Sequence, residues 1–173
     1  YGEHMSIALG AVDCRVDPAR SCVSVSATMV RQDPFACRDF LHPMVYRDHV
    51  ANVVLLGAPG TGKTTLAQRL AREFDTQWMP EYGREYWERH QRDRRLTLEQ
   101  LVEIAEGHRL REDALLLQAR RFLFTDTNAL TTATFARYYH SSVPARLQQL
   151  ADEGGRRYDL VLDVRTNRRP RDY

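Results

Sequence analysis

The pattern of hydrophobic and polar residues changes near residue 50. Residues 1–49 hold short, broken apolar runs with proline and cysteine among them, whereas the rest of the chain alternates apolar runs with amphipathic stretches. Such a change is typical of a boundary between two folding units. We place the boundary at about His49 and expect two domains, residues 1–49 and residues 50–173.

Short apolar runs in the second segment have the length of buried β-strands. Residues 51–56 form one such run, and residues 122–126 form another that ends in an acidic residue. We expect residues 158–164 to form a further central strand and residues 76–79 to form a brief extended piece.

Apolar residues spaced three and four positions apart predict helices between these strands. The expected helices cover residues 63–74, 97–117, 129–139 and 144–153, and Thr97 is the expected N-cap of the longest one. Alternating strands and helices predict an α/β fold of the P-loop kinase type, with a parallel sheet and helices on both faces. The longest helix is expected to bury these apolar side chains: Leu101, Ile104, Ala105, Leu110, Ala114 and Leu117.

Composition narrows the class of protein. The chain has 173 residues, 43% hydrophobic and 28% charged, and its formal net charge of +2 gives no support for a nucleic-acid or membrane-surface partner. No apolar run approaches ~18 residues, which argues against a membrane span. Three cysteines without C-x-x-C spacing suggest neither a zinc site nor a disulfide framework. We expect a cytoplasmic protein and make no prediction of its oligomeric state.

The single lysine of the chain, Lys63, stands against twenty-four arginines and lies in a G-x-x-x-x-G-K-[ST] pattern. This pattern is typical of a nucleotide-binding P-loop, in which backbone amides cradle phosphates and the lysine reaches the β- and γ-phosphates. A glycine-rich turn is the alternative, but the pattern falls between a predicted strand and a predicted helix, as a P-loop requires. The predicted ATP site comprises Gly57, Ala58, Pro59, Gly60, Thr61, Gly62, Lys63, Thr64 and Thr65.

Two carboxylates and an arginine join Lys63 as candidates for the chemistry of phosphoryl transfer. Asp126 ends an apolar strand and, with Thr64, would hold Mg²⁺ or polarise the nucleophile, although a helix N-cap is an alternative role. Glu81 would take the proton of an acceptor hydroxyl, and Arg84 would hold the acceptor's oxygens. A surface ion pair at spacing i,i+3 is an equally good interpretation of Glu81 and Arg84.

Four aromatic residues lie close to Glu81 in the sequence. Aromatic side chains beside an acceptor site can stack on a planar, cationic ring of the ligand. Packing in the hydrophobic core is the commoner role of any one such side chain. The four residues are Trp78, Tyr82, Tyr86 and Trp87.

Other charged and titratable residues receive no firm role. His90, His108 and His140 lie on charged helices, and we expect them to be exposed. The last residues of the sequence are rich in arginine. They could form a lid that closes on the phosphates, but a solvated tail is the commoner role of such a run of charges. Its arginines are Arg165, Arg168, Arg169 and Arg171.

Taken together, these residues resemble the NadR family, whose members join a nicotinamide-nucleotide adenylyltransferase domain to a ribosylnicotinamide kinase domain. The resemblance rests on the P-loop, on E-Y-G-R-E at residues 81–85 and on F-T-D-T-N-A-L-T-T at residues 124–132. It implies that ATP phosphorylates the 5′-hydroxyl of nicotinamide riboside in NAD biosynthesis. The full-length protein would also adenylylate the resulting mononucleotide.

The first segment resembles the end of a Rossmann-like nucleotidyltransferase domain. Residues 25–31, V-S-A-T-M-V-R, are similar to the I-S-x-T-x-x-R signature of that superfamily. The resemblance implies that Ser26, Thr28 and Arg31 contact ATP phosphates. A helix cap with a neighbouring arginine is the alternative.

Three departures from the family pattern affect what we expect. No H-x-G-H motif precedes residue 16, so we expect the adenylyltransferase half to be inactive as it stands. The P-loop interior, Ala58-Pro59-Gly60, is closer to that of a generic ATPase than to the family's Glu-Ser pair. An acidic stretch expected after Val164 is missing, so we expect a fragment whose kinase domain is cut at its C-terminal end.

Two other functions fit the same motifs. One is a P-loop ATPase or regulatory ATP-binding module without a small-molecule acceptor, in which case ADP release would not depend on nicotinamide riboside. The other is a nucleoside kinase with a different acceptor.

Overall fold

The computed structural model describes residues 2–14, 16–92 and 95–165 and divides the chain into two compact units. The first unit spans residues 1–41 and the second residues 42–173. Three of the four arginines at the end of the chain, beginning with Arg168, lie outside the described residues.

The first unit contains only helices in its described part. They are α1 (Gly2–Leu9), α2 (Ala27–Gln32) and the 3₁₀ helix η1 (Arg38–Phe40). Cys37 is the one buried residue among those described in this unit, so helix packing within it is sparse. Because the described part holds no strand, the Rossmann-like assignment of this segment stays a prediction.

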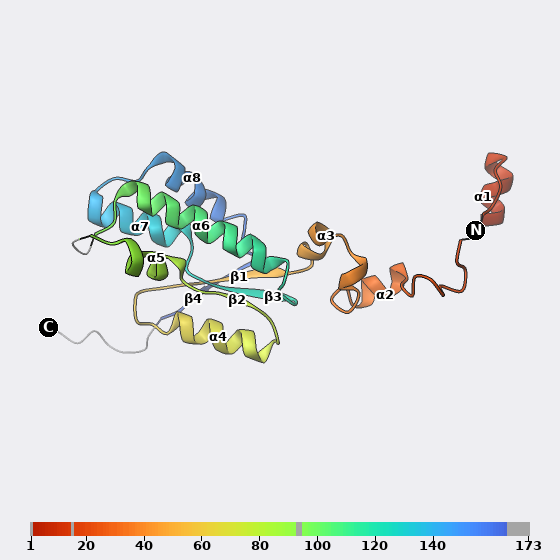
Figure 1. The fold of residues 1–173 in the computed structure, drawn as a ribbon, viewed down its shortest axis with the longest axis horizontal. Helices are drawn as coiled ribbons and strands as arrows, with labels where there is room; N and C mark the ends of the chain where they lie inside the picture. Colours follow the sequence, from red (N-terminus) through yellow and green to blue (C-terminus); the bar gives the residue numbers. More distant parts are fainter. Residues whose placement is uncertain (1, 15, 93–94, 166–173) are drawn as a thin grey trace. The chain divides into compact units, whose positions relative to one another are not determined.

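The second unit is an α/β layer structure with a parallel sheet, as the sequence predicts. Figure 1 shows α4 on one face of the sheet and α5 to α8 on the other. The strands are β1 (Ala51–Leu56), β2 (Trp78–Met79), β3 (Phe122–Asp126) and β4 (Leu160–Asp163). The helices are α3 (Pro43–Arg47), α4 (Lys63–Glu73), α5 (Tyr82–His90), α6 (Leu98–Leu116), α7 (Ala129–His140) and α8 (Ala145–Gly154).

The second unit begins before the expected boundary because α3 packs within it. The Tyr46 side chain is 3% exposed, and its hydroxyl donates to the Ala119 carbonyl oxygen at 2.7 Å. Arg47 forms a salt bridge with Asp113 of α6 at 2.9 Å. These contacts fix α3 at the end of the sheet from which β1 starts.

The strand order is β2-β3-β1-β4, and every pairing is parallel. The expectation that residues 158–164 form a central strand is wrong, because β4 is the edge strand of this described sheet. Its Leu160 and Val161 are 51% and 53% exposed. An apolar run alone does not distinguish a central strand from an edge strand whose far side is open.

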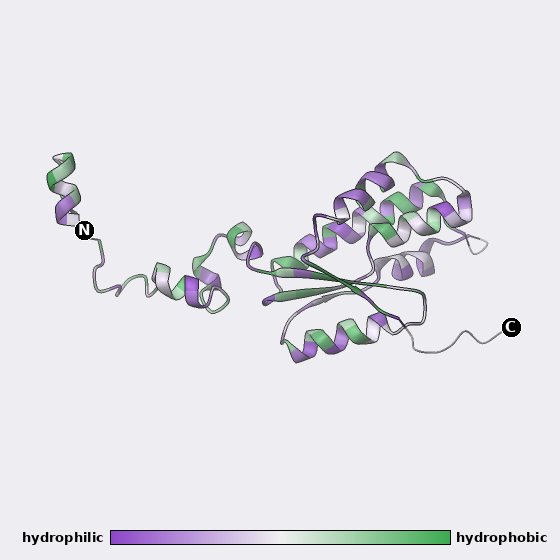
Figure 2. Ribbon diagram, turned by 180° about the vertical axis from the view of Figure 1, so that it is seen from behind, coloured by the Kyte–Doolittle hydropathy of each residue, from purple (hydrophilic) through white to green (hydrophobic). Residues whose placement is uncertain are grey.

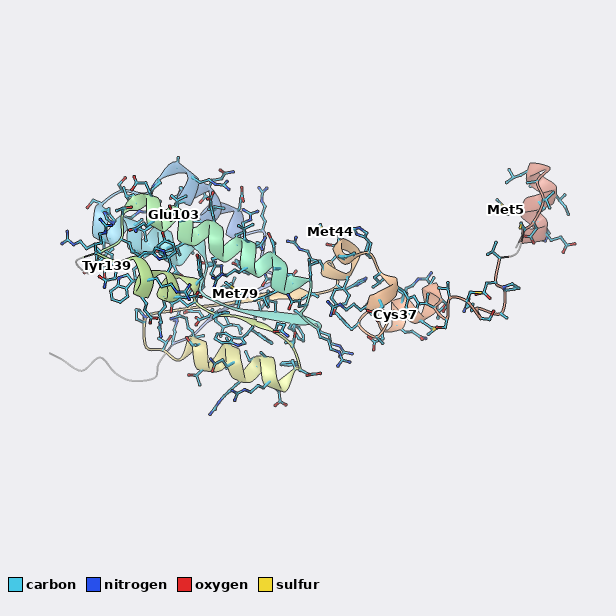
Figure 3. All side chains as sticks on the ribbon, in the orientation of Figure 1. Met5, Cys37, Met44, Met79, Glu103 and Tyr139 are labelled. Carbon is cyan, nitrogen blue, oxygen red and sulfur yellow. The ribbon has the colours of Figure 1, made fainter. Side chains whose placement is uncertain are left out.

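Successive residues of the central strands face opposite helix layers. On one face, Val53, Leu55 and Phe124 pack against Ala67 and Ala71 of α4. Figure 2 shows the strands as mainly hydrophobic and the helices as mixed in character. Met79 of β2, labelled in Figure 3, is 1% exposed.

A second core joins α5, α6, α7 and α8. Thr97 caps α6 as predicted, and Gln100 completes a capping box with it. The buried members of this core are Tyr86, Leu101, Ile104, Ala105, Ala133, Ala136, Leu147, Leu150 and Ala151.

The buried face of α6 differs from the expected one in its second half. Leu110 is 71% exposed and Ala114 is also exposed, whereas His108 and Glu112 are buried. The buried positions continue at helical spacing from Leu101 through these two polar residues to Leu116. Glu112 can occupy its position because its hydrogen-bond partners lie on the facing strand and on the loop before β4.

Glu112 is the centre of a buried polar network beneath the sheet. Its Oε1 accepts from Asn52 Nδ2 at 2.6 Å and from Arg157 Nε at 2.5 Å, and its Oε2 accepts from the Tyr158 hydroxyl at 2.9 Å. Asn52 Oδ1 in turn accepts from Thr125 Oγ1 at 3.2 Å. Burial and the Glu112 carboxylate raise the pKa of Tyr158, so this hydroxyl stays a donor. The network joins α6, β1, β3 and the start of β4.

No helix in the described ranges is both long and apolar enough to cross a membrane.

We predict that Glu112→Ala lowers the free energy of unfolding by about 3 kcal/mol, because Asn52 Nδ2 and Arg157 Nε lose the buried carboxylate that they share, although Arg157 keeps its contact with Asp113 at 2.6 Å. The matched control is Glu106→Ala on the same helix, which removes an exposed salt bridge to Arg146 and should cost less than about 1 kcal/mol. Urea denaturation followed by circular dichroism measures both values. Equal losses in the two variants would contradict the central role of Glu112.

Candidate nucleotide and acceptor site

The loop between β1 and α4 has the backbone of a phosphate-binding turn. Gly60 and Gly62 have φ angles of 76° and 92°, in the left-handed region that favours glycine. Gly62 is also the N-cap of α4, so the positive end of an eleven-residue helix faces the loop. The local sequence therefore produces the geometry that anionic phosphates need.

Gly57 is required for a different reason. A Cβ atom at this position would lie 2.3 Å from the Val164 carbonyl oxygen, just after β4. The chains are that close because Val164 N donates to the Leu56 carbonyl oxygen at 2.7 Å. Only glycine lets the loop leave β1 beside β4 without a clash.

Lys63 lies over the loop, as the P-loop pattern predicts. Its Nζ donates to the carbonyl oxygens of Gly57 and Ala58, each at 2.9 Å. Thr61 Oγ1 also donates to the Ala58 carbonyl oxygen at 2.9 Å. The ammonium is thus held by weak neutral acceptors, which a phosphate oxygen could replace.

Thr64 and Asp126 come together although they are far apart in the sequence. Thr64 Oγ1 donates to Asp126 Oδ2 at 2.5 Å. Asp126 is 0% exposed, and its Oδ1 has no hydrogen-bond partner among the described residues. The N-cap of α7 is Asn128, whose Oδ1 accepts from Leu130 N and Thr131 N, so Asp126 is not the capping residue.

These oxygens fit a magnesium ion. Mg²⁺ prefers carboxylate, hydroxyl and phosphate oxygens and keeps several waters, so one or two protein ligands suffice. The unpartnered Asp126 Oδ1 is the kind of buried acceptor that a metal-bound water would satisfy. The described ranges contain no cluster of three or more His, Cys, Asp or Glu side chains able to hold a metal.

A cavity of about 560 Å³ opens beside Asp126, at the residues that follow β3. Most of its lining residues come from helices α5, α6 and α7. Its lining residues include Glu81, Arg84, Trp87, Glu88, Leu101, Ile104, His108, Thr127, Asn128, Thr131, Thr132, Phe135, Tyr139 and His140.

Glu81 and Arg84 share the cavity wall at the start of α5. Arg84 Nη2 lies 3.1 Å from Glu81 Oε2, so the ion pair at spacing i,i+3 is present. The Glu81 side chain is 27% exposed and that of Arg84 is 67% exposed. The ion-pair interpretation is therefore confirmed, while the roles of Glu81 and Arg84 toward an acceptor stay predictions at a pair that lines the cavity.

The four aromatic residues near Glu81 separate into different environments. Only Trp87 lines the cavity, while Trp78 packs with the core beneath α4. Tyr82 lies 4.1 Å beneath the Arg111 guanidinium, and the Tyr86 hydroxyl donates to Glu103. Core packing is thus the role of most of the group.

Sequence reasoning missed two aromatic residues of the cavity. Phe135 and Tyr139 lie one helical turn apart on α7, and both line it. Tyr139 is labelled in Figure 3 near the outer end of that helix. Their i,i+4 spacing after the F-T-D-T-N segment was a usable signal.

The expectation that all three helical histidines are exposed is wrong for His108, which is buried, and for His140, which is half-buried. His108 is 6% exposed and lines the cavity from α6, with Nδ1 at 3.7 Å from Glu112 Oε2. Its Nε2 has no hydrogen-bond partner among the described residues. Burial holds the pKa of this imidazole below its usual range, although the Glu112 carboxylate opposes the shift.

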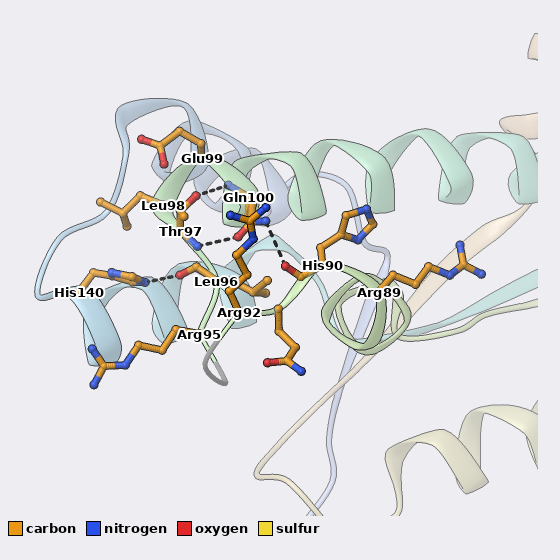
Figure 4. A pocket seen from close by; sticks show the side chains of 11 residues that line it. Arg89, His90, Arg92, Arg95, Leu96, Thr97, Leu98, Glu99, Gln100 and His140 are labelled. Atoms are coloured by element: carbon orange, nitrogen blue, oxygen red, sulfur yellow. Dashed lines mark hydrogen bonds between the residues drawn. The ribbon is translucent and has the colours of Figure 1, made fainter.

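A neighbouring hollow lies at the junction of α5 and α6 and is shown in Figure 4. Gln100 Nε2 donates to the His90 carbonyl oxygen at 3.5 Å, and the Leu96 carbonyl oxygen lies 2.9 Å from His140 Nε2. The first bond ties α6 to the end of α5, and the second ties the loop before α6 to the end of α7. The hollow shares Arg95, Leu96 and His140 with the lining of the cavity.

The residues predicted to bind phosphate in the first unit form a short helix. Ser26 is the N-cap of α2, and its Oγ accepts from Met29 N at 3.1 Å. Thr28 and Arg31 lie within the same six-residue helix. The helix-cap alternative therefore holds for Ser26, and phosphate contacts by Ser26, Thr28 and Arg31 stay predictions.

Comparison with known proteins agrees with this geometry. The sequence model of the AAA domain matches residues 52–172. Two relatives are the Trifunctional NAD biosynthesis/regulator proteins NadR of Escherichia coli (strain K12) and Salmonella typhimurium (strain LT2), 33% and 32% identical over 169 residues. Each alignment covers 96% of this chain and 40% of the relative, so the chain spans about two fifths of their length.

Two solved structures of NadR share the fold. One is a complex with NR and the other a complex with NAD and AMP-PNP, with TM-scores of 0.62 and 0.63. Both are 28% identical to this chain, and each match covers 83% of this chain and 42% of the other. The chain therefore belongs to the AAA domain family and is a homologue of the NadR proteins.

Proposed function

We propose that this chain transfers the γ-phosphoryl group of ATP to the 5′-hydroxyl of nicotinamide riboside, in a cytoplasmic step of NAD biosynthesis. The observation that carries the proposal is the Thr64–Asp126 pair, which ties the P-loop helix to the end of β3, immediately before Thr127 of the cavity wall. The NadR homologues are named for NAD biosynthesis, and solved NadR structures hold NR or AMP-PNP. A small-molecule acceptor accounts for the cavity better than ATP hydrolysis alone does.

On the nucleotide side of the site, backbone amides and the Lys63 ammonium would bind the phosphates. Amides of the loop from Gly57 to Thr65 would bind the phosphates, with the N-terminus of α4 behind them. Lys63 would exchange its two carbonyl contacts for the β- and γ-phosphate oxygens, which are stronger, charged acceptors. Bound Mg²⁺, held through Thr64 and Asp126, would neutralise charge on the phosphates.

The acceptor side supplies a proton acceptor and an anchor. Glu81 would take the proton from the 5′-hydroxyl as its oxygen forms the new bond to the γ-phosphorus, and the bond from that phosphorus to ADP breaks. Arg84 holds the Glu81 carboxylate at 3.1 Å and has further donors for the acceptor's oxygens. The products are nicotinamide mononucleotide and ADP, and Asp126 is the second candidate for the base.

The volume of the cavity supports a nucleoside-sized acceptor. About 560 Å³ lies within the range of sites that enclose small organic ligands. Apolar and aromatic walls from α5 and α7 combine with a few polar groups, as in such sites.

We expect ADP release by the purified protein to rise at least tenfold when nicotinamide riboside is added, with one nicotinamide mononucleotide formed per ADP. Coupled ADP measurement and chromatography of the products check this stoichiometry. ADP release that is independent of riboside, with no mononucleotide formed, would favour an ATPase instead. Adenosine, cytidine and uridine as alternative acceptors test the other nucleoside kinases.

Asp126→Asn should lower kcat by at least about a hundredfold, because an amide is a poorer ligand for a divalent cation and cannot accept a proton. Higher Mg²⁺ should recover part of the loss. The control is Asp152→Asn on α8, where the carboxylate is exposed and accepts from Gln148 Nε2 at 2.8 Å. Wild-type rates for the Asp126→Asn variant at limiting Mg²⁺ would remove Asp126 from the mechanism.

Glu81→Gln tests the base directly. We expect a fall in kcat of about 10²-fold or more with little change in ATP affinity, since the amide keeps the shape but cannot take the proton. The comparison variant is Glu73→Gln at the exposed end of α4. If kcat falls with Asp126→Asn but not with Glu81→Gln, the base is Asp126.

A further inference from the structure

The E-Y-G-R-E-Y run at the start of α5 places its side chains on two faces of the helix, and only one of these faces lines the cavity. Glu81 and Arg84 are among the lining residues. The side chains of Tyr82, Glu85 and Tyr86 contact α6 instead. The proposed chemistry uses the first face and gives the second face no role.

One side of α6 receives the second face of α5. Glu103, Gly107 and Arg111 lie four residues apart, so they share one side of that helix. Glu103, labelled in Figure 3, accepts from the Tyr86 hydroxyl, and the Arg111 guanidinium carbon lies 4.1 Å from the centre of the Tyr82 ring. We name these contacts, together with those of Glu85, the α5–α6 seam.

Arg111 holds two residues of α5 at once. Its Nη1 and Nη2 donate to the two carboxylate oxygens of Glu85 at 2.6 and 3.4 Å, while the guanidinium lies over the Tyr82 ring. Glu85 also pairs with Arg89 at 3.0 Å, but Arg89 belongs to α5 and cannot tie it to another helix. Arg111 therefore opposes rotation of α5 about its own axis, which would carry Glu81 away from the cavity.

Gly107 makes room for the Tyr82 ring. A Cβ atom at this position would clash with Tyr82 Cε1 and would lie 3.1 and 3.2 Å from Cζ and the hydroxyl oxygen. Glycine is an unfavourable residue in the middle of a helix, where alanine is the most favourable one. Its presence in α6 lets the ring lie beside the helix backbone, at the depth where Arg111 covers it.

We propose that Gly107 and Arg111 are positioning residues, which set the rotation of α5 so that Glu81 meets the acceptor hydroxyl. This inference rests on the proposed function. Glu81 is the N-cap of α5 and directly precedes Tyr82, so a displaced ring moves the carboxylate through one peptide unit. A misplacement of about 1 Å at a reacting group can lower a rate by about 10²-fold.

The first test is Gly107→Ala, with Gly154→Ala on α8 as the matched control. An added Cβ at Gly154 would have only ordinary contacts, the nearest at 3.7 Å. We expect kcat with nicotinamide riboside to fall about tenfold or more in Gly107→Ala, with KM for ATP unchanged, and to stay within about twofold of wild type in the control. Leucine lacks the clashing ring atoms, so adding Gly107→Ala to Tyr82→Leu should cost less than about twofold further.

The second test does not depend on close packing. Arg111→Met is compared with Arg109→Met, because the two arginines have side-chain exposures of 43% and 38% and Arg109 pairs with Glu153 of α8. We expect Arg111→Met to lower kcat about tenfold and Arg109→Met less than about twofold, with similar unfolding temperatures for both, since such ion pairs add little to stability. Arg111→Lys can still pair with Glu85 and should stay within about threefold of wild type.

A third measurement separates positioning from a general loss of stability. If Arg111 acts through Glu81, Arg111→Met should cost less than about twofold in a Glu81→Gln background, where the proton acceptor is already absent. Steady-state measurement of ADP and nicotinamide mononucleotide gives kcat and both KM values for every variant.

Three results would overturn the inference. They are a kcat within about twofold of wild type in Arg111→Met or in a folded Gly107→Ala variant, equal losses in Arg111→Met and Arg109→Met, and a loss from Arg111→Met that is undiminished by Glu81→Gln. If Gly107→Ala does not fold, the Arg111 variants decide. If wild-type protein does not phosphorylate the riboside at all, the proposed function fails and this inference fails with it.

Discussion

The parallel pairing of β1 with β3 is the interaction on which the site depends. It sets Leu55 beside Asp126, and Thr127 N donates to the Leu55 carbonyl oxygen at 3.1 Å just beyond the pair. The P-loop leaves β1 and the acidic strand end leaves β3 at the same edge of the sheet, as parallel strands require. A shift of this register by one residue would turn the Asp126 side chain to the other face, away from Thr64.

The two faces of the β1–β3 pair differ in polarity. On the α4 side, the central strands present Val53, Leu55 and Phe124. On the α6 side, Asn52 and Thr125 face Glu112, so charge is buried directly behind the strand that ends in Asp126. This arrangement holds α6, and with it His108, at a defined depth below the cavity.

Features encoded by neighbouring residues could be predicted from the sequence. The strand at residues 51–56, the P-loop and the Thr97 cap each depend on a few adjacent side chains, and all three are present in the structure. The burial of His108 and Glu112 could not be predicted in this way, since it depends on Asn52 and Arg157, which lie 60 residues before and 45 residues after Glu112. Nor does an apolar run reveal its place in a sheet, so the sequence alone does not assign β4 to the edge.

The exposed edge strand has a consequence for strand pairing. In the described sheet, β4 pairs only with β1, and its other edge presents backbone donors and acceptors next to the half-exposed Leu160 and Val161. An open, apolar strand edge is a template on which another strand can add. In the described sheet this edge is therefore a place where a further strand can pair, and a charged substitution at Val161 would disfavour such pairing.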